Sequence, residues 1–272
     1  MKYILKRWIA GILVILTFFT SLVTSATSVS AASPSANILF WNASVQDSGE
    51  VSELKAGYNH GKVLYAMIDG HTAYCMNFGL AARAGQLMNS YDNSSTSLSD
   101  MQALYLRYCL YYGFSSTRTS APSNDQCDQF IATQAMVWII EKGIYGTDNA
   151  DSAASKLCDT APNPDSSYQY YETLRDNIDK GIDAIIPSFS ASRISQAPIY
   201  ELEWNEETQR YEIILEDRND VLSEFDLSLD GYETSIDGNI LTIYSDEVNT
   251  NATTGTLTSN SGKVQVVVQQ IR

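Results

Sequence analysis

The hydrophobic and polar positions change character twice along the chain. Residues 1–31 hold a long apolar run behind a basic start. From about residue 33 to residue 190, strand-like alternation is followed by runs with helical spacing. From residue 197 onward, short alternating runs are separated by turn residues. The pattern therefore predicts an export signal, a mixed α and β part, and an all-β part.

Residues 1–31 have the features of a secretory signal peptide. Basic residues come first, an apolar run extends from residue 9 to residue 19, and Val29-Ser30-Ala31 is a small-residue cleavage site. A transmembrane anchor is the alternative, but the run is short for a span and a Ser/Thr/Ala-rich tail follows it. We therefore expect a secreted protein that does not insert in a membrane once the signal is removed.

The mixed part begins with a predicted β-hairpin. Residues 62–68 form one strand, Asp69-Gly70 is the turn, and residues 72–78 form the returning strand. Cys75 therefore lies on a strand. Side chains alternate across a strand, so three others share the face of Cys75. These are His71, Ala73 and Asn77.

Three helices follow the hairpin. Ser99 caps the first, Gln102 completes a capping box, and the helix stops at Gly113. The third runs from about residue 166 to residue 185. Before it lies a polar stretch at residues 147–164, for which no helix is predicted.

The middle helix carries a glutamine within an apolar stripe. It begins at Ser123 or Asp125 and ends near Gly143. The residues that recur at helical spacing on one face are Phe130, Gln134, Val137, Trp138 and Glu141. A buried carboxamide must be hydrogen-bonded or consumed in a reaction. Gln134 is therefore a candidate for chemistry.

The all-β part follows a Ser-rich linker at residues 187–196. Alternating runs predict strands near residues 200–204, 211–215, 225–229, 240–244 and 264–268. Short strands with regular turns are typical of an immunoglobulin-like β-sandwich, which we expect over residues 197–272.

The net charge of the chain disfavours two classes of partner. The net charge of the chain is −15, and residues 1–31 contribute +3, so the remainder carries about −18. This acidity disfavours binding to nucleic acid and to anionic membranes. No Cys-x₂-Cys or His-x₃-His spacing occurs, so we predict no metal site and no cofactor.

Two short motifs carry a family resemblance. Tyr74-Cys75 and, about sixty residues later, Gln134 followed by Trp138 resemble the thioester domain of Gram-positive surface adhesins. That family has an aromatic residue or Leu before its cysteine, and a Trp four residues after its glutamine. The resemblance covers roughly residues 36–190. It implies an α+β thioester domain over residues 33–190, with a β-sheet core and a helical insertion.

The resemblance also implies the chemistry. The sulfur of Cys75 attacks the side-chain carbonyl of Gln134 and expels ammonia, which leaves an internal thioester. A lysine amine on a host extracellular protein then attacks that thioester, and an isopeptide bond joins Gln134 to the partner. This acyl transfer occurs once, so the protein is not an enzyme. The host target is not named by the sequence.

Three residues are candidates to assist. His71 is a possible base, and Tyr74 and Trp138, together with Met76, are expected to shield the thioester from water. We expect a monomeric adhesin, held at the cell wall or cell surface through a region absent from this chain.

The four cysteines also allow disulfides, because the chain is exported. With Cys75 in a thioester, three remain. Cys109 lies in an apolar helix and is expected to be a buried small hydrophobic residue. Cys127 and Cys158 are then candidates for a bridge. Lys263 has no evident partner for an intradomain isopeptide bond, so none is predicted.

Two other function classes stay open. One is a noncovalent peptide- or glycan-binding surface module with disulfides, in which the tyrosines of the first helix would form the contact surface. The other is a cysteine hydrolase, which needs a histidine beside its thiol. His60 and His71 are the only histidines, and both precede Cys75 within fifteen residues. This placement disfavours a hydrolase.

Overall fold

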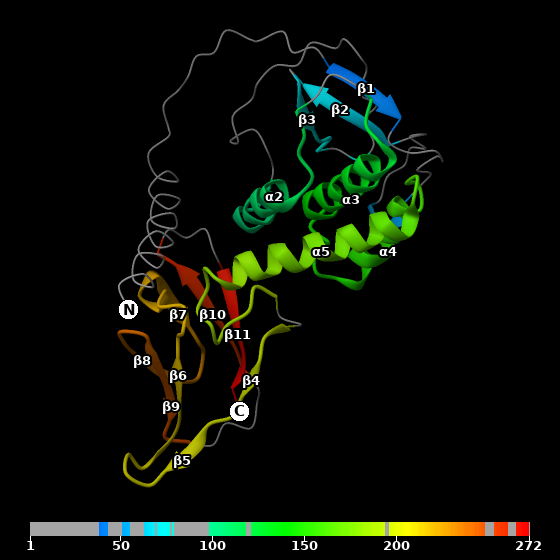
Figure 1. The fold of residues 1–272 in the computed structure, drawn as a ribbon. Helices are drawn as coiled ribbons and strands as arrows, with labels where there is room; N and C mark the ends of the chain where they lie inside the picture. The colour runs from blue at the N-terminus through cyan, green and yellow to red at the C-terminus, as the bar shows by residue number, and fades with distance from the viewer. Residues whose placement is uncertain are drawn as a thin grey trace, which may run out of the picture. The chain divides into compact units, whose positions relative to one another are not determined.

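Figure 1 shows the computed structural model of the chain as a ribbon. The structure describes residues 38–42, 51–54, 63–68, 70–76, 78, 98–117, 121–193, 196–247, 253–260 and 265–271, and of residues 38–42, 253 and 265–271 it describes the backbone alone. The predicted signal peptide, Asn77 and Lys263 lie outside the described residues.

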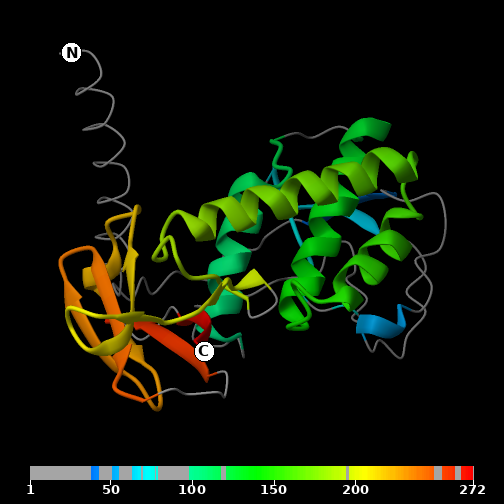
Figure 2. The ribbon, with the colours of Figure 1, turned by 90° about the horizontal axis from the view of Figure 1, so that it is seen from below.

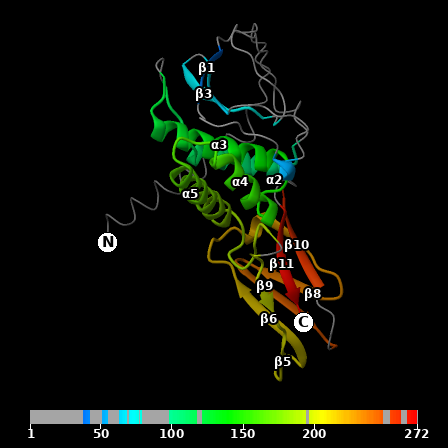
Figure 3. The ribbon, with the colours of Figure 1, turned by 90° about the vertical axis from the view of Figure 1, so that its right-hand side faces the viewer.

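The first part combines a small sheet with helices. Strands β1 (Ile38–Asn42), β2 (Leu64–Ile68) and β3 (His71–Ala73) form an antiparallel sheet in that order. The helices are η1 (Ser52–Leu54), α2 (Asp100–Tyr112), α3 (Asn124–Glu141), α4 (Asp148–Cys158) and α5 (Pro164–Asp183). The sheet lies on the side of α3 opposite α5 (Figures 1 and 3). Helix α5 crosses both α2 and α3 (Figure 2).

The helix starts follow their local sequence. Ser99 and Gln102 form the predicted capping box at α2, which is confirmed. Ser123, rather than Asp125, caps α3, and Gln126 completes a second capping box there. The carboxamide of Gln102 also donates to the backbone oxygen of Ile140 at 2.8 Å. One residue therefore caps α2 and binds the end of α3.

Helix α3 is the centre of this part. Every residue from Phe130 to Ile140 is buried, and α2, α4, α5 and β2 all contact the helix. The expectation of a single apolar face is therefore too narrow, because a helix packed on all sides is apolar all round.

The polar stretch at residues 147–164 contains helix α4, which was not predicted. Its buried face consists of small side chains, with one leucine: Ala150, Ala153, Ala154, Leu157 and Cys158. Alanines add little to a hydrophobic pattern, so the polar residues between them dominate the sequence signal.

The second part contains two four-stranded sheets. The strands are β4 (Ile199–Tyr200), β5 (Glu203–Asn205), β6 (Arg210–Glu216), β7 (Phe225–Ser228), β8 (Glu233–Asp237), β9 (Ile240–Ser245), β10 (Thr253–Ser259) and β11 (Gln265–Ile271), with the short helix η4 (Leu222–Glu224). The sheet orders are β4-β11-β10-β7 and β5-β6-β9-β8. Only β4 and β11 pair in parallel among the described strands. The assignment to the immunoglobulin type stays a prediction.

Strands β8 and β10 were not predicted. All five residues of β8 are exposed, so no buried face produces an alternating pattern. Strand β10 consists of Thr, Gly, Ser and one Leu, and only Leu257 marks its inner side.

A buried aspartate organises the backbone after β6. The carboxyl group of Asp217 accepts hydrogen bonds from the N–H groups of Ser188, Asn219, Val221 and Leu222, at 2.7–3.0 Å. Ser188 follows α5 in the chain, so this one side chain joins that segment to the turn after β6.

Candidate functional site

Cys75 lies just beyond the end of β3. The strand stops at Ala73, so the prediction of a strand over residues 72–78 is wrong past that residue. The N–H of Cys75 donates to Oε1 of Gln134 at 2.8 Å, and its carbonyl oxygen accepts from Nε2 of Gln134 at 2.8 Å. A side-chain amide thus occupies the place that a neighbouring strand would take, which is why the ladder ends here.

The edge of β3 that faces away from β2 is covered by the segment that follows α2. The N–H of Thr72 donates to the backbone oxygen of Ser116 at 3.1 Å, and His71 forms an isolated bridge with Thr117. The hydroxyl of Thr72 bonds to the backbone of Ser116 as well. His71 and Thr72 therefore pair with this segment, whereas the backbone of Cys75 bonds to Gln134.

Tyr74 fixes the backbone immediately before Cys75. Its ring stacks on Phe130 of α3, with centroids 5.0 Å apart, and its hydroxyl donates to the backbone oxygen of Phe114. Burial raises the pKa of Tyr74 well above its ordinary value, so the phenol stays neutral at physiological pH. Cys75 is consequently held against the face of α3 that carries Gln134.

Gln134 and Trp138 are both buried on α3. Gln134 is 2% exposed, and both polar atoms of its carboxamide bond to Cys75. Trp138 is 8% exposed, and its ring meets Phe78 edge to face at 4.8 Å. Its Nε1 is buried and has no hydrogen-bond partner among the described residues. Met76 is half-buried and packs against the same core.

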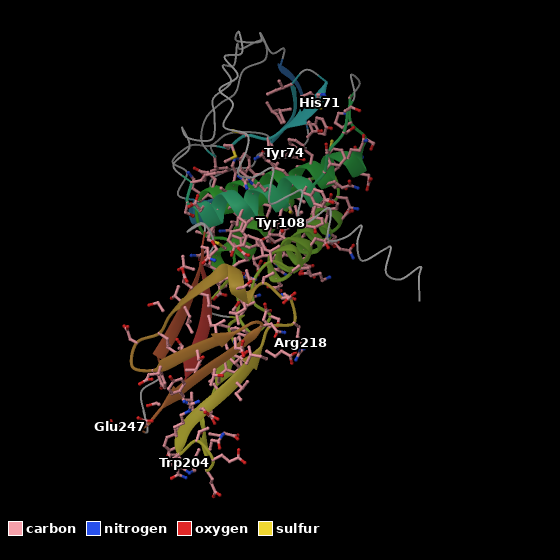
Figure 4. The ribbon with its side chains drawn as sticks, turned by 90° about the vertical axis from the view of Figure 1, so that its left-hand side faces the viewer. His71, Tyr74, Tyr108, Trp204, Arg218 and Glu247 are labelled. Atoms are coloured by element: carbon pink, nitrogen blue, oxygen red, sulfur yellow. The ribbon has the colours of Figure 1, made fainter. Side chains whose placement is uncertain are left out.

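His71 is exposed, at the hairpin end of β3. Figure 4 shows it farther from the helices than Tyr74. The strand alternation that placed it on one face with Cys75 ends at Ala73, because Tyr74 and Cys75 have left the ladder. Nothing in the described part of the chain hydrogen-bonds its ring.

The structure contains no disulfide between Cys127 and Cys158, so the bridge considered for them is absent. Cys109, Cys127 and Cys158 are buried, while Cys75 is half-buried. Burial raises the pKa of Cys158 to about 12 and raises that of Cys109 as well. These two thiols are therefore poor nucleophiles at neutral pH, since the thiolate is the reactive form.

Two residues that support the site were not singled out from the sequence. The hydroxyl of Thr133 accepts from the N–H of Phe114 at 3.0 Å and donates to the backbone oxygen of Gln129. A Cβ on Gly113 would lie 2.6 Å from Cγ2 of Thr133, so the segment after α2 needs glycine to approach α3 this closely. In the sequence, only the glycine at the end of this helix indicates such a close contact.

The described residues hold no group of three or more His, Cys, Asp or Glu side chains suited to a metal ion. No helix among them has the length and apolar character needed to cross a membrane.

The fold and the site define a domain in which a cysteine after a short strand meets a glutamine on a central helix. Residues 72–180 match the family model described as "Thioester domain", so this part of the chain is similar to that family. The solved structure titled "Thioester domain of the Staphylococcus aureus TIE protein" has 14% sequence identity, a TM-score of 0.32, and coverage of 86% of this chain and 92% of that chain. A likeness this low carries no weight for fold or function. No curated protein matches the chain.

Proposed function

We propose that the protein forms an internal thioester between Sγ of Cys75 and Cδ of Gln134, and then couples covalently to a primary amine. The observation that carries the proposal is the double hydrogen bond, at 2.8 Å each, between the carboxamide of Gln134 and the backbone of Cys75. It fixes the acyl carbon beside the residue that bears the nucleophile. The match of residues 72–180 to the thioester family supports the same chemistry.

The first step is closure of the thioester. The sulfur adds to Cδ of Gln134, the C–N bond breaks, and Nε2 leaves as ammonia after taking the proton of the thiol. The N–H of Cys75 already donates to Oε1, where negative charge develops during the addition. Well-held partners reach effective molarities of about 10⁵–10⁸ M, so folding alone is sufficient to drive the step.

The second step is transfer to a partner. A neutral amine adds to Cδ, the C–S bond breaks, and the sulfur of Cys75 leaves with a proton from the amine. The product is an amide between Gln134 and the partner, with Cys75 regenerated as a thiol. Because the acyl group is not restored, each molecule reacts once and the protein is not a catalyst.

The biological role that we infer is adhesion at a bacterial surface. The amine is a lysine of a host extracellular protein, and the bond resists mechanical removal because it is covalent. The domain spans residues 33–190, and residues 197–272 form an immunoglobulin-like spacer in a secreted, surface-attached, monomeric protein. The predicted signal over residues 1–31 and the family match support this role.

Intact mass spectrometry tests the chemistry. Freshly purified protein is expected to lack one ammonia relative to its sequence, and to gain one methylamine on treatment with that amine. Cys75→Ala and Gln134→Ala variants should keep their full mass and stay inert. An intact amide at Gln134 and a reactive thiol at Cys75 in the untreated protein would contradict the proposal.

A noncovalent binding module is the second candidate, and an exposed aromatic surface favours it. Leu110, Tyr111 and Tyr112 at the end of α2 are 47%, 70% and 37% exposed. A complex formed through this surface alone dissociates in denaturing electrophoresis, whereas the amide product survives.

A further inference from the structure

The indole nitrogen of Trp138 is a buried donor without an acceptor. The residue is 8% exposed, and within the part of the chain that the structure describes Nε1 has no hydrogen-bond partner. Buried donors in folded proteins are nearly always paired, because leaving one unpaired forfeits its bond to water. A phenylalanine at this position would fill much of the same space without that cost. The N–H therefore needs an explanation beyond packing.

Trp138 lies next to the two segments that carry the proposed thioester. It follows Gln134 by one turn of α3, so the two side chains lie on the same face of the helix. Side chains on a helix lean toward its N-terminus, which directs the indole back over the turn that carries Gln134. The ring also contacts Phe78, three residues after Cys75. The unpaired donor is thus flanked by the two segments that carry the reacting atoms.

The carbonyl oxygen of Gln134 has room for a second donor. Oε1 accepts one hydrogen bond, from the N–H of Cys75 at 2.8 Å, and a carbonyl oxygen has two lone pairs. During aminolysis the amine nitrogen bonds to Cδ, and the π pair of the carbonyl moves onto Oε1. That pair then re-forms the carbonyl as the C–S bond breaks. The electrons of the C–S bond go to the sulfur of Cys75, which also takes a proton from the amine.

We propose that the Nε1–H of Trp138 is the second donor to Oε1 of Gln134 while that oxygen carries negative charge. The inference rests on the proposed thioester chemistry and assigns a further residue to it. A donor that is unpaired in the resting protein, and paired when charge develops, stabilises the transition state more than the ground state, and such differential binding accelerates a reaction.

The rate of methylamine attack on the thioester, followed by intact mass, tests this role. Trp138→Phe should react about 100-fold more slowly than the wild type, which is the usual effect of losing one donor to an oxyanion. Its unfolding midpoint should stay close to that of the wild type, because removing an unpaired buried donor offsets the packing lost with the smaller ring. Trp204→Phe is the matched control: Trp204 is 46% exposed on β5 and also meets an aromatic ring, Tyr211, edge to face.

A packing role and a donor role have opposite signatures. If Trp138 only packs, its replacement lowers stability and leaves the rate within about twofold of the wild type, and this result overturns the inference. Site-specific incorporation of β-(3-benzothienyl)alanine at position 138 keeps the fused ring and removes only the N–H. If Trp138→Phe does not fold, the reaction rate of this variant distinguishes the donor role from the packing role. A wild type that has lost no ammonia refutes the proposed function itself, before any variant is compared.

Discussion

At the scale of single residues, the site depends on a side-chain amide that behaves like a strand. The carboxamide of Gln134 presents one acceptor and one donor to the backbone of Cys75, in the order that a neighbouring peptide would. Only an amide supplies both groups with this geometry. The requirement for glutamine is therefore structural as well as chemical, and the two contributions are separable by substitution.

Replacing Gln134 with glutamate tests the structural contribution. Gln134→Glu has no ammonia to lose, so no thioester forms, and a carboxylate oxygen would face the carbonyl oxygen of Cys75. Burial and that repulsion should raise the pKa of the new carboxyl group in the folded state above its unfolded value. The stability of this variant is then highest at low pH and falls as the pH rises through the folded pKa.

Denaturant unfolding at pH 5 and pH 8 is the measurement. Relative to the wild type, we expect Gln134→Glu to lose about 1–3 kcal/mol more at pH 8 than at pH 5. Gln129→Glu is the control, since Gln129 lies on the same helix and its Nε2 bonds the surface residue Asp125. An equal loss at both pH values would show that the carboxamide of Gln134 is not held against Cys75.

At the scale of elements, close contacts between side chains position the helices, and the helix propensities of the residues do not predict these contacts. Gly181 sits inside α5, where glycine is unfavourable by about 1 kcal/mol relative to alanine. A Cβ there would lie 2.6 Å from Cε1 of Tyr108 on α2. The glycine therefore allows α2 and α5 to approach with a tyrosine ring between them.

Gly181→Ala should consequently destabilise the protein despite the better helix propensity. Forcing the ring of Tyr108 to move costs about 1–3 kcal/mol, as overpacking in a core usually does. In the double variant with Tyr108→Ala, the added methyl group should become neutral or favourable. A double-mutant cycle by chemical denaturation measures this coupling, and additivity of the two changes would contradict it.

Helix η1 is attached to α4 by a charged cluster. Oε1 of Glu53 accepts from Nζ of Lys156 and from Oγ of Ser152, both at 2.7 Å. The hydrogen bond from Lys156 is the main reason that the pKa of Glu53 falls to about 2, with Ser152 second. A carboxyl group with a lowered folded pKa stabilises the protein above its unfolded pKa, and this stabilisation is lost as the pH falls through the folded value.

Glu53→Gln should therefore cost less than about 1 kcal/mol at pH 7, because the pair lies near solvent. The difference from the wild type should shrink as the pH falls from 4.5 toward 2, the interval over which the carboxylate of Glu53 is protonated. Thermal or urea unfolding across this range is the check. A difference that stays constant with pH would assign the effect to packing instead.

At the scale of the whole molecule, the acidic charge should govern which amines reach the site. The net charge is −15, and it is more negative once residues 1–31 are set aside. Opposite charges speed encounter between molecules, and salt screens this attraction, with a Debye length of about 10 Å at 0.1 M and about 3 Å at 1 M. The partner that reacts fastest should be a lysine within a basic surface.

Two peptides with one reactive lysine each, set among either arginines or glutamates, test this expectation. The rate of coupling to the basic peptide should fall by about tenfold or more between low and high salt, while that of the acidic peptide should rise. Mass spectrometry of the adducts gives both rates. An identical response of the two peptides to salt would mean that the charge of the protein does not steer its partner.

The sequence alone determined the features whose causes lie within a few residues. The capping box at Ser99 depends on a partner three positions away, so a local pattern was sufficient to predict it, and Ser123 was one of the two caps considered for the next helix. The motif residues Cys75 and Gln134 were likewise identified from short strings, and the family match agrees with the domain that they suggested. The alternating runs also predicted most strands of the second part.

Only the tertiary structure decided the features that depend on distant partners. The strand after Gly70 ends at Ala73 because Gln134, 59 residues after Cys75, takes the place of a neighbouring strand. Helix α4 was missed because its alanines become a core face only when α3 packs on them. Trp138 has an unpaired donor that no sequence pattern reveals, since pairing is a property of the packed interior. Caps and short motifs depend on neighbouring residues and can be recognised in the sequence, whereas burial and long-range hydrogen bonds exist only after the chain has folded.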